Sequence, residues 1–405
     1  MARRRRKRVL FVLSELDLGG PQKSLLALFE RIDFDQLDVY VYLIQPGGSL
    51  VPYLDDRVHL LASNELISAV ALPSRGTLNA LTTLLKHRRF GIFFAGVRAI
   101  LKYLMFRTNM NQERQAIWRD HHDELPKIDG EYDLVFGIQG LASYCAVDCV
   151  SAAKRFHWIR SDARVLRRDE LIDGEYYRLM DGALSVSQTS AEIFEQLYPF
   201  MRGRVTVFHN HIPVQLYDEL PADLSMMKCP KGCVRILTVC RLDPLKGLDL
   251  AVAACRLLVR AGLSVRWFVL GDGVMREQIE RMIQDANLDG IFVLLGFELN
   301  TMAFIEQCDV FVHPSRTEGK ANVVDEAKFA GKPVVATDYD TVGDQIEDGV
   351  TGIICAMDAE AIAESISRLV NSPELAERIA HNSMGHEDGI ADVTGFLVDL
   401  CEAQS

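Results

Sequence analysis

The chain has 405 residues, of which 49% are hydrophobic, and a formal net charge of −12 at pH 7. This length predicts two domains or more, and the hydrophobic content is enough for full cores. The overall acidity argues against nucleic acid as the main partner, and no apolar run reaches the roughly 18 residues that a membrane-spanning helix needs.

The negative charge is concentrated in the second half of the chain. Residues 1–212 contain 28 Lys and Arg against 25 Asp and Glu, whereas residues 213–405 contain 16 against 31. We therefore expect the first half to be the part that meets an anionic membrane surface or an anionic acceptor. The basic run Arg3 to Arg8 is followed by only five apolar residues, and the nine cysteines are scattered. Both features predict free thiols in a reducing cytoplasm and no signal peptide.

The first predicted strand, Val9 to Leu13, leads into a glycine-containing turn and a helix over about 22–31. Gly19 and Gly20 would let the backbone approach a ligand at this strand-to-helix turn. An ordinary tight turn explains the same two glycines. The spacing is not the G-x-G-x-x-G of a dinucleotide site, which counts against a nicotinamide-dependent oxidoreductase.

Further strands are predicted at 38–44 and 132–138, and a basic, aromatic-rich segment lies between them at 86–107. Such a segment is typical of a helix that lies on a membrane interface. It is also typical of a helix that turns an apolar face to the core and a basic face to solvent. We favour the second interpretation because many helices of soluble proteins have this composition.

The second half of the chain begins with a segment, 213–233, that has three prolines and no clear apolar periodicity. This composition predicts a linker. From residue 234 onward, short apolar runs alternate with helical patterns. That alternation predicts a doubly wound parallel sheet with helices on both faces.

Two basic residues follow the first strand of this sheet. Arg241 leaves the strand, and Lys246 lies five residues later in a loop that ends at Gly247. The arginine fork and the lysine point charge together suit a diphosphate, although a solvated loop would carry the same pair. The run Gly271-Asp272-Gly273 predicts a tight turn after the next strand.

Residues 309–337 predict a strand, a loop, a helix and a second strand. The first strand ends near Pro314, and the helix is expected to begin at about Val323 and to stop at Gly331. Asn322 has the position and chemistry of an N-cap, with Asp325 as a capping-box-like partner.

Two acids lie eight positions apart in this stretch, Glu318 on the loop and Glu326 in the first helical turn. Ligands of open α/β sheets bind at the carboxyl ends of the strands. A helix N-terminus there favours a diphosphate, and the two carboxylates can accept hydrogen bonds from hydroxyls. The stretch therefore predicts a nucleotide-sugar site, although acids on a solvated face of an ordinary βαβ unit remain the alternative.

This region resembles the E-x7-E region of the family-4 retaining glycosyltransferases, which have the GT-B fold. Arg241 to Gly247 is similar to the family's G-R-L-x-x-x-K-G, with Cys240 where glycine is usual, and 271–273 matches its G-D-G. The resemblance covers residues 9 to about 385 and is strongest over 235–355. It implies two Rossmann-like doubly wound domains that face each other across a cleft.

The resemblance also implies a role for each matched residue. Arg241 and Lys246 would stabilise charge on the leaving phosphate, Glu318 would hold sugar hydroxyls, and Glu326 would hold the ribose. The remaining residues expected at the donor or acceptor are Gly19, Gly20, Arg160, Asp162, Asn210, Gly271, Asp272, Gly273, Gly319, Lys320, Ala321, Asn322 and Val323. No cofactor or catalytic metal is implied, so Asp33-Phe34-Asp35 and Asp338-Tyr339-Asp340, which have DxD spacing, are expected to be surface acids.

The stretch 157–162, HWIRSD, departs from the family's pattern. A histidine that points into the cleft is expected at the position of Arg160, and His157 lies three residues earlier. The departure puts a histidine-based role in doubt and supports the alternative of a non-catalytic nucleotide- or glycan-binding protein. Arg160 would instead hold a phosphate or carboxylate of the acceptor, and Asp162 retains the family's acid.

The resemblance places an acceptor-binding domain at 1–212 and a nucleotide-sugar-binding domain at 213–385, with a C-terminal segment, 386–405, that returns to the first domain. It implies transfer of a sugar from a nucleotide-sugar to a glycan or lipid-linked acceptor in cell-surface polysaccharide assembly. The expected location is the cytoplasm or the inner face of the membrane, and no nucleic acid partner is implied.

Overall fold

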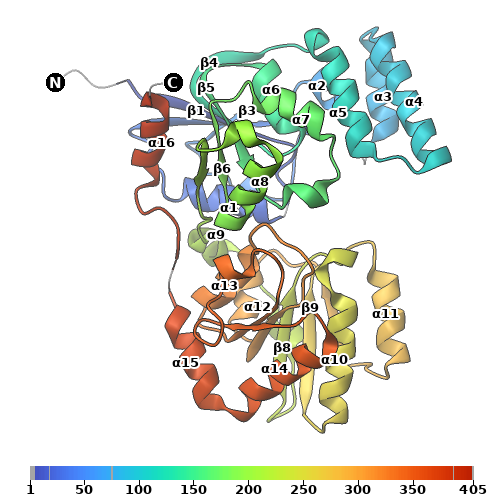
Figure 1. The fold of residues 1–405 in the computed structure, drawn as a ribbon, viewed down its shortest axis with the longest axis vertical. Helices are drawn as coiled ribbons and strands as arrows, with labels where there is room; N and C mark the ends of the chain where they lie inside the picture. The colour runs from blue at the N-terminus through green and yellow to red at the C-terminus, as the bar shows by residue number, and fades with distance from the viewer. Residues whose placement is uncertain (1–4, 18, 74–75, 386, 404–405) are drawn as a thin grey trace. The chain divides into compact units, whose positions relative to one another are not determined.

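The computed structural model describes residues 5–17, 19–73, 76–385 and 387–403. The contacts divide the chain into two units (Figure 1). Unit 1 comprises Met1–His209 together with Gly389–Ser405, and unit 2 comprises Asn210–Asp388. Unit 2 is therefore inserted into the sequence of unit 1. The boundary expected from the sequence lay between residues 212 and 213.

Among the described residues, unit 1 contains a seven-stranded sheet in the order β3-β2-β1-β4-β5-β6-β7. Every paired strand is parallel to its neighbour, and the first six strands follow the Rossmann order. The strands are β1 (Lys7–Leu13), β2 (Leu37–Leu43), β3 (His59–Leu61), β4 (Ile128–Ile138), β5 (Val150–Ile159), β6 (Gly182–Ser185) and β7 (Val205–Val207).

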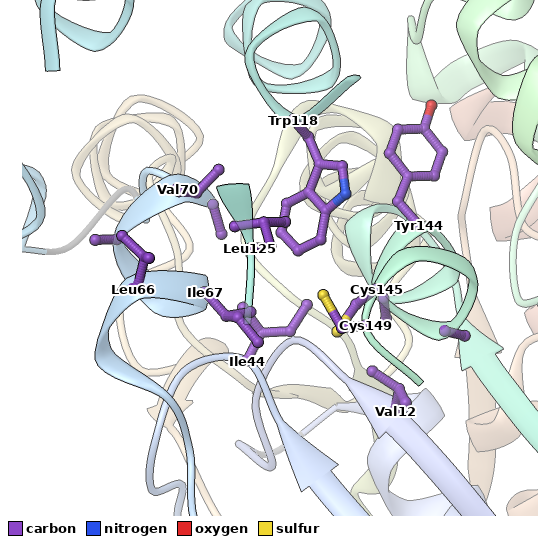
Figure 2. Close-up of a cluster of buried hydrophobic side chains, with 14 of the residues drawn as sticks. Val12, Ile44, Leu66, Ile67, Val70, Trp118, Leu125, Tyr144, Cys145 and Cys149 are labelled. Atoms are coloured by element: carbon purple, nitrogen blue, oxygen red, sulfur yellow. The ribbon is translucent and has the colours of Figure 1, made fainter. Parts of the chain in front are cut away.

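Helices pack on this sheet and bury a large apolar core. Figure 2 shows part of it, a single cluster that contains Val12 of β1 together with Ile67, Val70 and Trp118. Trp118 is fully buried, and its indole Nε1 donates to Asp148 Oδ2 at 2.8 Å. The helices of unit 1 are α1 (Gly20–Phe29), α2 (Glu65–Val70), α3 (Thr77–Lys86), α4 (Phe90–Phe106), α5 (Met110–His121), α6 (Leu141–Asp148), α7 (Glu170–Tyr177), α8 (Gln188–Leu197) and α16 (Val393–Glu402), with the 3-10 helices η1 (Val51–Tyr53), η2 (His122–Glu124), η3 (Ala163–Leu166) and η4 (Pro199–Met201).

Two features of unit 1 bear on the sequence predictions. The segment 86–107 forms α4, which packs one face into the core as predicted, but the opposite face is mostly apolar rather than basic. The C-terminal helix α16 contacts β4 and β5. Thr394 of α16 accepts a hydrogen bond on its hydroxyl from the N–H of Asp33 at 2.8 Å, which ties the end of the chain to unit 1.

Unit 2 contains a six-stranded parallel sheet in the order β10-β9-β8-β11-β12-β13, again the Rossmann order. Two apolar clusters cover its two faces, which confirms the doubly wound architecture predicted from the alternating pattern. The strands are β8 (Val234–Val239), β9 (Val265–Leu270), β10 (Phe292–Gly296), β11 (Val310–His313), β12 (Val334–Thr337) and β13 (Ile353–Cys355).

The helix of unit 2 that the sequence predicts within 309–337 is present as α13. The helix α10 begins directly after Gly247, and Gly262, just beyond its C-cap, stands in the left-handed region with φ of 84°. The segment 213–233 is more ordered than the predicted linker, because it forms α9 with Leu216 and Tyr217 buried. The helices are α9 (Val214–Glu219), α10 (Leu248–Arg260), α11 (Arg276–Asp285), α12 (Thr301–Ile305), α13 (Asn322–Phe329), α14 (Ala359–Asn371) and α15 (Pro373–Ser383), with the 3-10 helices η5 (Leu224–Met227), η6 (Pro244–Lys246) and η7 (Val342–Asp344).

Within the described ranges, no helix has both the length and the hydropathy that a membrane crossing requires.

Candidate functional site

Three loops gather at the carboxyl ends of the central strands of unit 2. They are 240–247 after β8, 271–275 after β9 and 314–321 after β11. β8 and β11 are neighbours in the sheet although two other strands, β9 and β10, lie between them along the chain, so the strand order reverses between them. In open α/β sheets ligands bind at this kind of reversal. We refer to these three loops as the unit 2 edge.

Glycines let the loops of the unit 2 edge approach one another closely. A Cβ added at Gly247 would lie 1.9 Å from the carbonyl oxygen of Pro314, and one at Gly271 would lie 1.9 Å from that of Cys240. Both glycines have positive φ, 63° and 134°. Since no larger residue fits these positions without displacing backbone, the glycines fix the contact between the loops.

Glu318, on the loop after β11, forms a charged cluster with His313 at the end of β11 and with Lys246 on the loop after β8. Its Oε1 lies 2.5 Å from Lys246 Nζ and 2.9 Å from His313 Nε2. Burial by itself would raise the pKa of the Glu318 carboxyl, but the hydrogen bond from His313 and the charge of Lys246 outweigh it and lower the pKa to about 2. The carboxylate is therefore ionised at neutral pH, and His313 Nε2 must carry a proton to donate to it.

Two buried polar atoms lie beside this cluster without a hydrogen-bond partner among the described residues. They are His313 Nδ1 and Tyr339 Oη. The two rings meet edge to face, with centroids 5.9 Å apart. Buried polar atoms normally have hydrogen-bond partners. Two such atoms without partners are therefore consistent with a site at which water or a ligand supplies the missing hydrogen bonds.

Arg241, the other predicted phosphate ligand, lies on the same loop as Lys246. Its side chain is 79% exposed, and one terminal nitrogen lies 3.2 Å from Asp243 Oδ2. The turn 271–273 packs on this loop, because Leu242 N donates to Asp272 O and Met275 N donates to Leu242 O, each at 3.0 Å. The structure therefore brings Arg241, Lys246 and the Gly-Asp-Gly turn together at one edge.

The beginning of α13 differs from its prediction. Asn322 is the first helical residue, and the N-cap is Ala321, which has no side chain that could cap. Instead the Oδ1 of Asn322 accepts from Asn210 Nδ2 at 2.6 Å. Asp325 accepts from Gln345 Nε2 at 2.9 Å rather than acting in a capping box. The predicted cap is wrong because long-range partners hold both side chains.

The same helix start contains the residues that were predicted to hold a diphosphate through backbone N–H groups. The N–H of Ala321 donates to Gln345 Oε1 at 2.9 Å, so an internal acceptor already holds it. The Lys320 ammonium is buried and lies 3.2 Å from Asp325 Oδ2. Gly319 is buried, whereas Val323 is partly exposed at the first turn. Val323 and Asn322 are the positions where a ligand would reach the helix start.

Glu326 is 2% exposed and bonded within unit 2. Tyr217 Oη donates to its Oε1 at 2.7 Å, and Thr301 Oγ1 donates to its Oε2 at 3.2 Å. Each carboxylate oxygen can accept more than one hydrogen bond, so these contacts orient the group and leave acceptor capacity. The ribose contact predicted for Glu326 stays a prediction.

The predicted residues of unit 1 lie at the carboxyl edge of its own sheet. Gly19 is the N-cap of α1, and Gly20 begins that helix. Arg160 is buried, donates to Ser24 Oγ at 2.8 Å, and stacks over Trp158. Burial lowers the pKa of Arg160 to about 9. Asp162 is buried, and both its carboxylate oxygens accept from the side chain of Arg164, Oδ1 at 3.0 Å and Oδ2 at 2.6 Å.

His157, the histidine nearest to the departure from the family's pattern, is a structural residue. It lies within β5, and its Nδ1 is 2.7 Å from Ser143 Oγ. Burial, together with the charge of Arg168, lowers the pKa of His157 to about 3, which keeps the ring neutral. His157 therefore does not take the place of the histidine that Arg160 replaces.

A cavity of about 250 Å³ opens at the carboxyl edge of the unit 1 sheet. Ser14 follows β1, Gln45 follows β2, and Gly140 follows β4, so the cavity lies at the strand reversal between β1 and β4. Arg114 and Arg168 are the two basic residues of its lining. The sequence analysis missed these residues. Their position in the sequence could have identified them, because a polar residue directly after a buried strand lies at this edge of the sheet.

The residues with DxD spacing are exposed acids, as predicted: Asp33, Asp35, Asp338 and Asp340. Over the described ranges, no group of three or more His, Cys, Asp or Glu residues is placed to hold a metal ion.

Comparison with known proteins connects the unit 2 edge to a family. Residues 229–385 match the family model described as glycosyl transferases group 1. The amylovoran biosynthesis glycosyltransferase AmsK of Erwinia amylovora is 32% identical over 145 residues, which is 34% of this chain and 36% of AmsK. The capsular polysaccharide biosynthesis glycosyltransferase CapM of Staphylococcus aureus is 31% identical over 143 residues, 34% of this chain and 37% of CapM. This chain thus spans little more than a third of the length of these curated relatives.

Solved structures resemble the chain over nearly its whole length. Anabaena Alr3699/HepE in complex with UDP and glucose has a TM-score of 0.67 at 17% identity, covering 98% of this chain and 99% of that one. WaaG, a glycosyltransferase involved in lipopolysaccharide biosynthesis, has a TM-score of 0.62 at 16% identity, covering 98% and 100%. At these identities the likeness concerns the fold, and it confirms the predicted GT-B fold of two Rossmann-like domains.

Proposed function

We propose that this chain, whose residues 229–385 match the glycosyl transferases group 1 family, transfers a sugar from a nucleotide-sugar to a glycan or lipid-linked acceptor. The observation that carries the proposal is the cluster of Lys246, Glu318 and His313 at the strand reversal of unit 2. It combines a cation for a diphosphate with an ionised acceptor for sugar hydroxyls, next to the start of α13.

Residues of the unit 2 edge and of the first turns of α13 have distinct parts in this proposal. Arg241, with its exposed guanidinium, and Lys246 bind the diphosphate and stabilise the charge that grows on it as the sugar leaves. Glu318, fixed by His313, accepts hydrogen bonds from the sugar hydroxyls. Glu326, oriented by Tyr217, accepts from the ribose. The N–H groups at Asn322 and Val323 add the positive end of the helix dipole.

We further propose a retaining reaction of the family-4 type that needs no metal ion. The acceptor hydroxyl attacks the sugar on the face from which the diphosphate departs, and the departing phosphate oxygen takes the hydroxyl proton. The new glycosidic bond forms as the sugar–phosphate bond breaks, so no nucleophile of the protein is required. The protein then contributes positioning and electrostatic stabilisation.

The acceptor would bind in unit 1, where the 250 Å³ cavity lies at the strand reversal. We propose a role in cell-surface polysaccharide assembly, at the inner face of the membrane or in the cytoplasm. The polysaccharide biosynthesis named for AmsK and CapM supports this assignment. The second candidate, a binding protein without turnover, has Arg160 in its favour, because the expected histidine is absent.

A donor screen followed by a transfer assay tests the proposal. Thermal shifts would be recorded with UDP-, GDP- and ADP-sugars, where a ligand at 100 times its Kd adds about 2.7 kcal/mol of stability. The stabilising donor would then be incubated with lipid-linked glycan extracts, and sugar transfer would be measured. Binding with transfer, lost in Lys246→Ala, is the expected result. Binding without transfer to any extract would favour the second candidate, and stabilisation by no nucleotide-sugar would overturn both.

A further inference from the structure

Helix α4 of unit 1 exposes an apolar face that no described part of the chain covers. Phe94 is 66% exposed and Leu104 is 62% exposed, and Phe90, Leu101 and Met105 are also exposed. Counted from Phe90, these positions are i, i+4, i+11, i+14 and i+15, which lie on one face of a helix. We call these five residues the α4 outer face.

The opposite side of α4 is anchored, so the exposed residues cannot simply turn inward. Ile92 and Ala99 are fully buried in the unit 1 core. A Cβ added at Gly96 would lie 3.1 Å from a Leu81 methyl group of α3, which shows how closely the two helices pack. Lys102 on the flank donates to Glu113 of α5 at 2.8 Å. The helix is therefore held between α3 and α5, at the outer edge of unit 1 (Figure 1).

The stretch of sequence that contains α4 carries only basic charged residues. Between Glu65 and Glu113 the sequence contains no Asp or Glu but seven Lys and Arg residues, in a protein of net charge −12. Arg98 and Arg107, both exposed, flank the apolar residues directly. Acids from outside this stretch, Glu65, Glu113 and Glu124, balance only part of the charge.

The basic charge indicates which kind of partner could cover the α4 outer face. A second copy of the chain would bring one basic cluster against another, which is unfavourable. An anionic lipid surface matches both properties at once, because aromatic and aliphatic side chains enter the headgroup boundary while basic side chains reach the lipid phosphates. We propose that the α4 outer face docks unit 1 on an anionic membrane surface. This inference concerns the attachment alone and does not depend on glycosyl transfer.

The test is co-sedimentation of the full chain with vesicles, either of phosphatidylcholine alone or of phosphatidylcholine mixed with phosphatidylglycerol. We expect binding to the anionic vesicles at low salt and its loss at high salt, where charge is screened. Phe94→Ser with Leu101→Ser should lower the partition coefficient about tenfold or more, because two buried apolar side chains are lost. Arg98→Gln should lower it about fivefold, since one basic residue near the surface is worth about 1 kcal/mol.

Matched controls separate the surface from general effects of substitution. Leu171→Ser changes a more exposed leucine of unit 1 outside α4, and Arg202→Gln changes an exposed arginine there. Neither should alter vesicle binding, and all variants should unfold at the temperature of the parent protein. Three results would overturn the proposal: no binding to anionic vesicles at low salt, unchanged binding of the Phe94/Leu101 variant, or a dimer without vesicles that this variant abolishes.

Discussion

The carboxyl edges of the two sheets share a strand order and differ in chemistry. In unit 2, a lysine from the loop after β8 meets a carboxylate from the loop after β11, with 2.5 Å between Lys246 and Glu318. In unit 1, the loop after β1 carries Asp17, which accepts from the N–H of Ser49 at 2.9 Å. The loop after β4 carries the neutral Gln139, which donates to Ser161 Oγ at 2.5 Å.

The comparison teaches that the strand order determines where a ligand can bind, whereas the residues of the loops determine which ligand binds there. Both sheets reverse their strand order and both offer an edge where a ligand can bind. At the unit 2 edge a lysine from one loop meets a buried carboxylate from another, and the pKa of that carboxylate is lowered to about 2. At the unit 1 edge the cavity is lined instead by two arginines, Arg114 and Arg168. The four predictions below test whether the donor chemistry is confined to that edge.

The largest expected effect is on turnover. Arg241→Ala and Lys246→Ala should each lower kcat by about 10²–10³-fold, because charge on the leaving diphosphate grows in the transition state. The KM for the donor should change less. Glu15→Gln, a change in the corresponding unit 1 loop, should leave the donor KM unaltered. Steady-state kinetics with varied donor measures both, and a loss of donor affinity at constant kcat would contradict the assignment.

The second effect is on stability and concerns the glycines that bring the unit 2 loops together. Gly271→Ala should lower the free energy of unfolding by about 3 kcal/mol, because the new Cβ meets the Cys240 carbonyl at 1.9 Å and φ is 134°. Gly262→Ala has positive φ but no atom within 4 Å of the new Cβ, and should cost about 1–2 kcal/mol. Urea unfolding compares the two, and equal losses would show that the loop contact adds no constraint.

The third effect concerns Glu326 and distinguishes its own contribution to donor binding from that of Tyr217, which orients it. Glu326→Ala should weaken donor binding by about 1.5–3 kcal/mol through loss of a charged acceptor. It should also lower stability, because the hydroxyls of Tyr217 and Thr301 lose their acceptor. Tyr217→Phe removes only the orienting hydrogen bond and should weaken binding by less than about 1.5 kcal/mol. Calorimetric titration with the donor decides, and unchanged affinity in Glu326→Ala would remove this residue from the site.

The fourth effect is the pH dependence that Glu318 contributes. Its pKa in the folded protein, about 2, is below the ordinary 4.5, so ionisation stabilises the fold above pH 4.5. That contribution, about 1–2 kcal/mol given the desolvation cost of a buried pair, is lost as pH falls from 4.5 towards 2. Glu318→Gln should therefore show a weaker loss of stability over this interval. Thermal unfolding across the interval would contradict the prediction if both proteins behaved alike.

The sequence predicts the sheet of unit 2 well because its strands are short apolar runs between glycine-containing loops. It also predicts that Lys246 and Glu318 lie at one edge of that sheet, since both follow strands that end there. It misses the true N-cap of α13, because Asn322 is held by Asn210, a partner 112 positions away. Local spacing contains no information about such a partner.

Three other misses have the same physical origin. His313 ends an apolar strand and has the pattern of a core residue, so its contact with Glu318 emerges only from the loop geometry. The segment 213–233 has the composition of a linker, yet Tyr217 is buried and its hydroxyl donates to Glu326, a partner 109 positions away. The exposed apolar face of α4 was equally hidden, because helical periodicity identifies a face but does not say which face the neighbouring helices cover.

The insertion of unit 2 into unit 1 has a consequence for synthesis. The two ends of unit 2 lie close together, because the N–H of Ile212 donates to Glu387 Oε1 at 3.0 Å. Unit 1 receives α16 only after all of Asn210–Asp388 has been made. Domains generally fold as units while the chain emerges from the ribosome. The later-made unit 2 is therefore complete first, and unit 1 waits, with the binding place of α16 on β4 and β5 uncovered, until the end of the chain arrives.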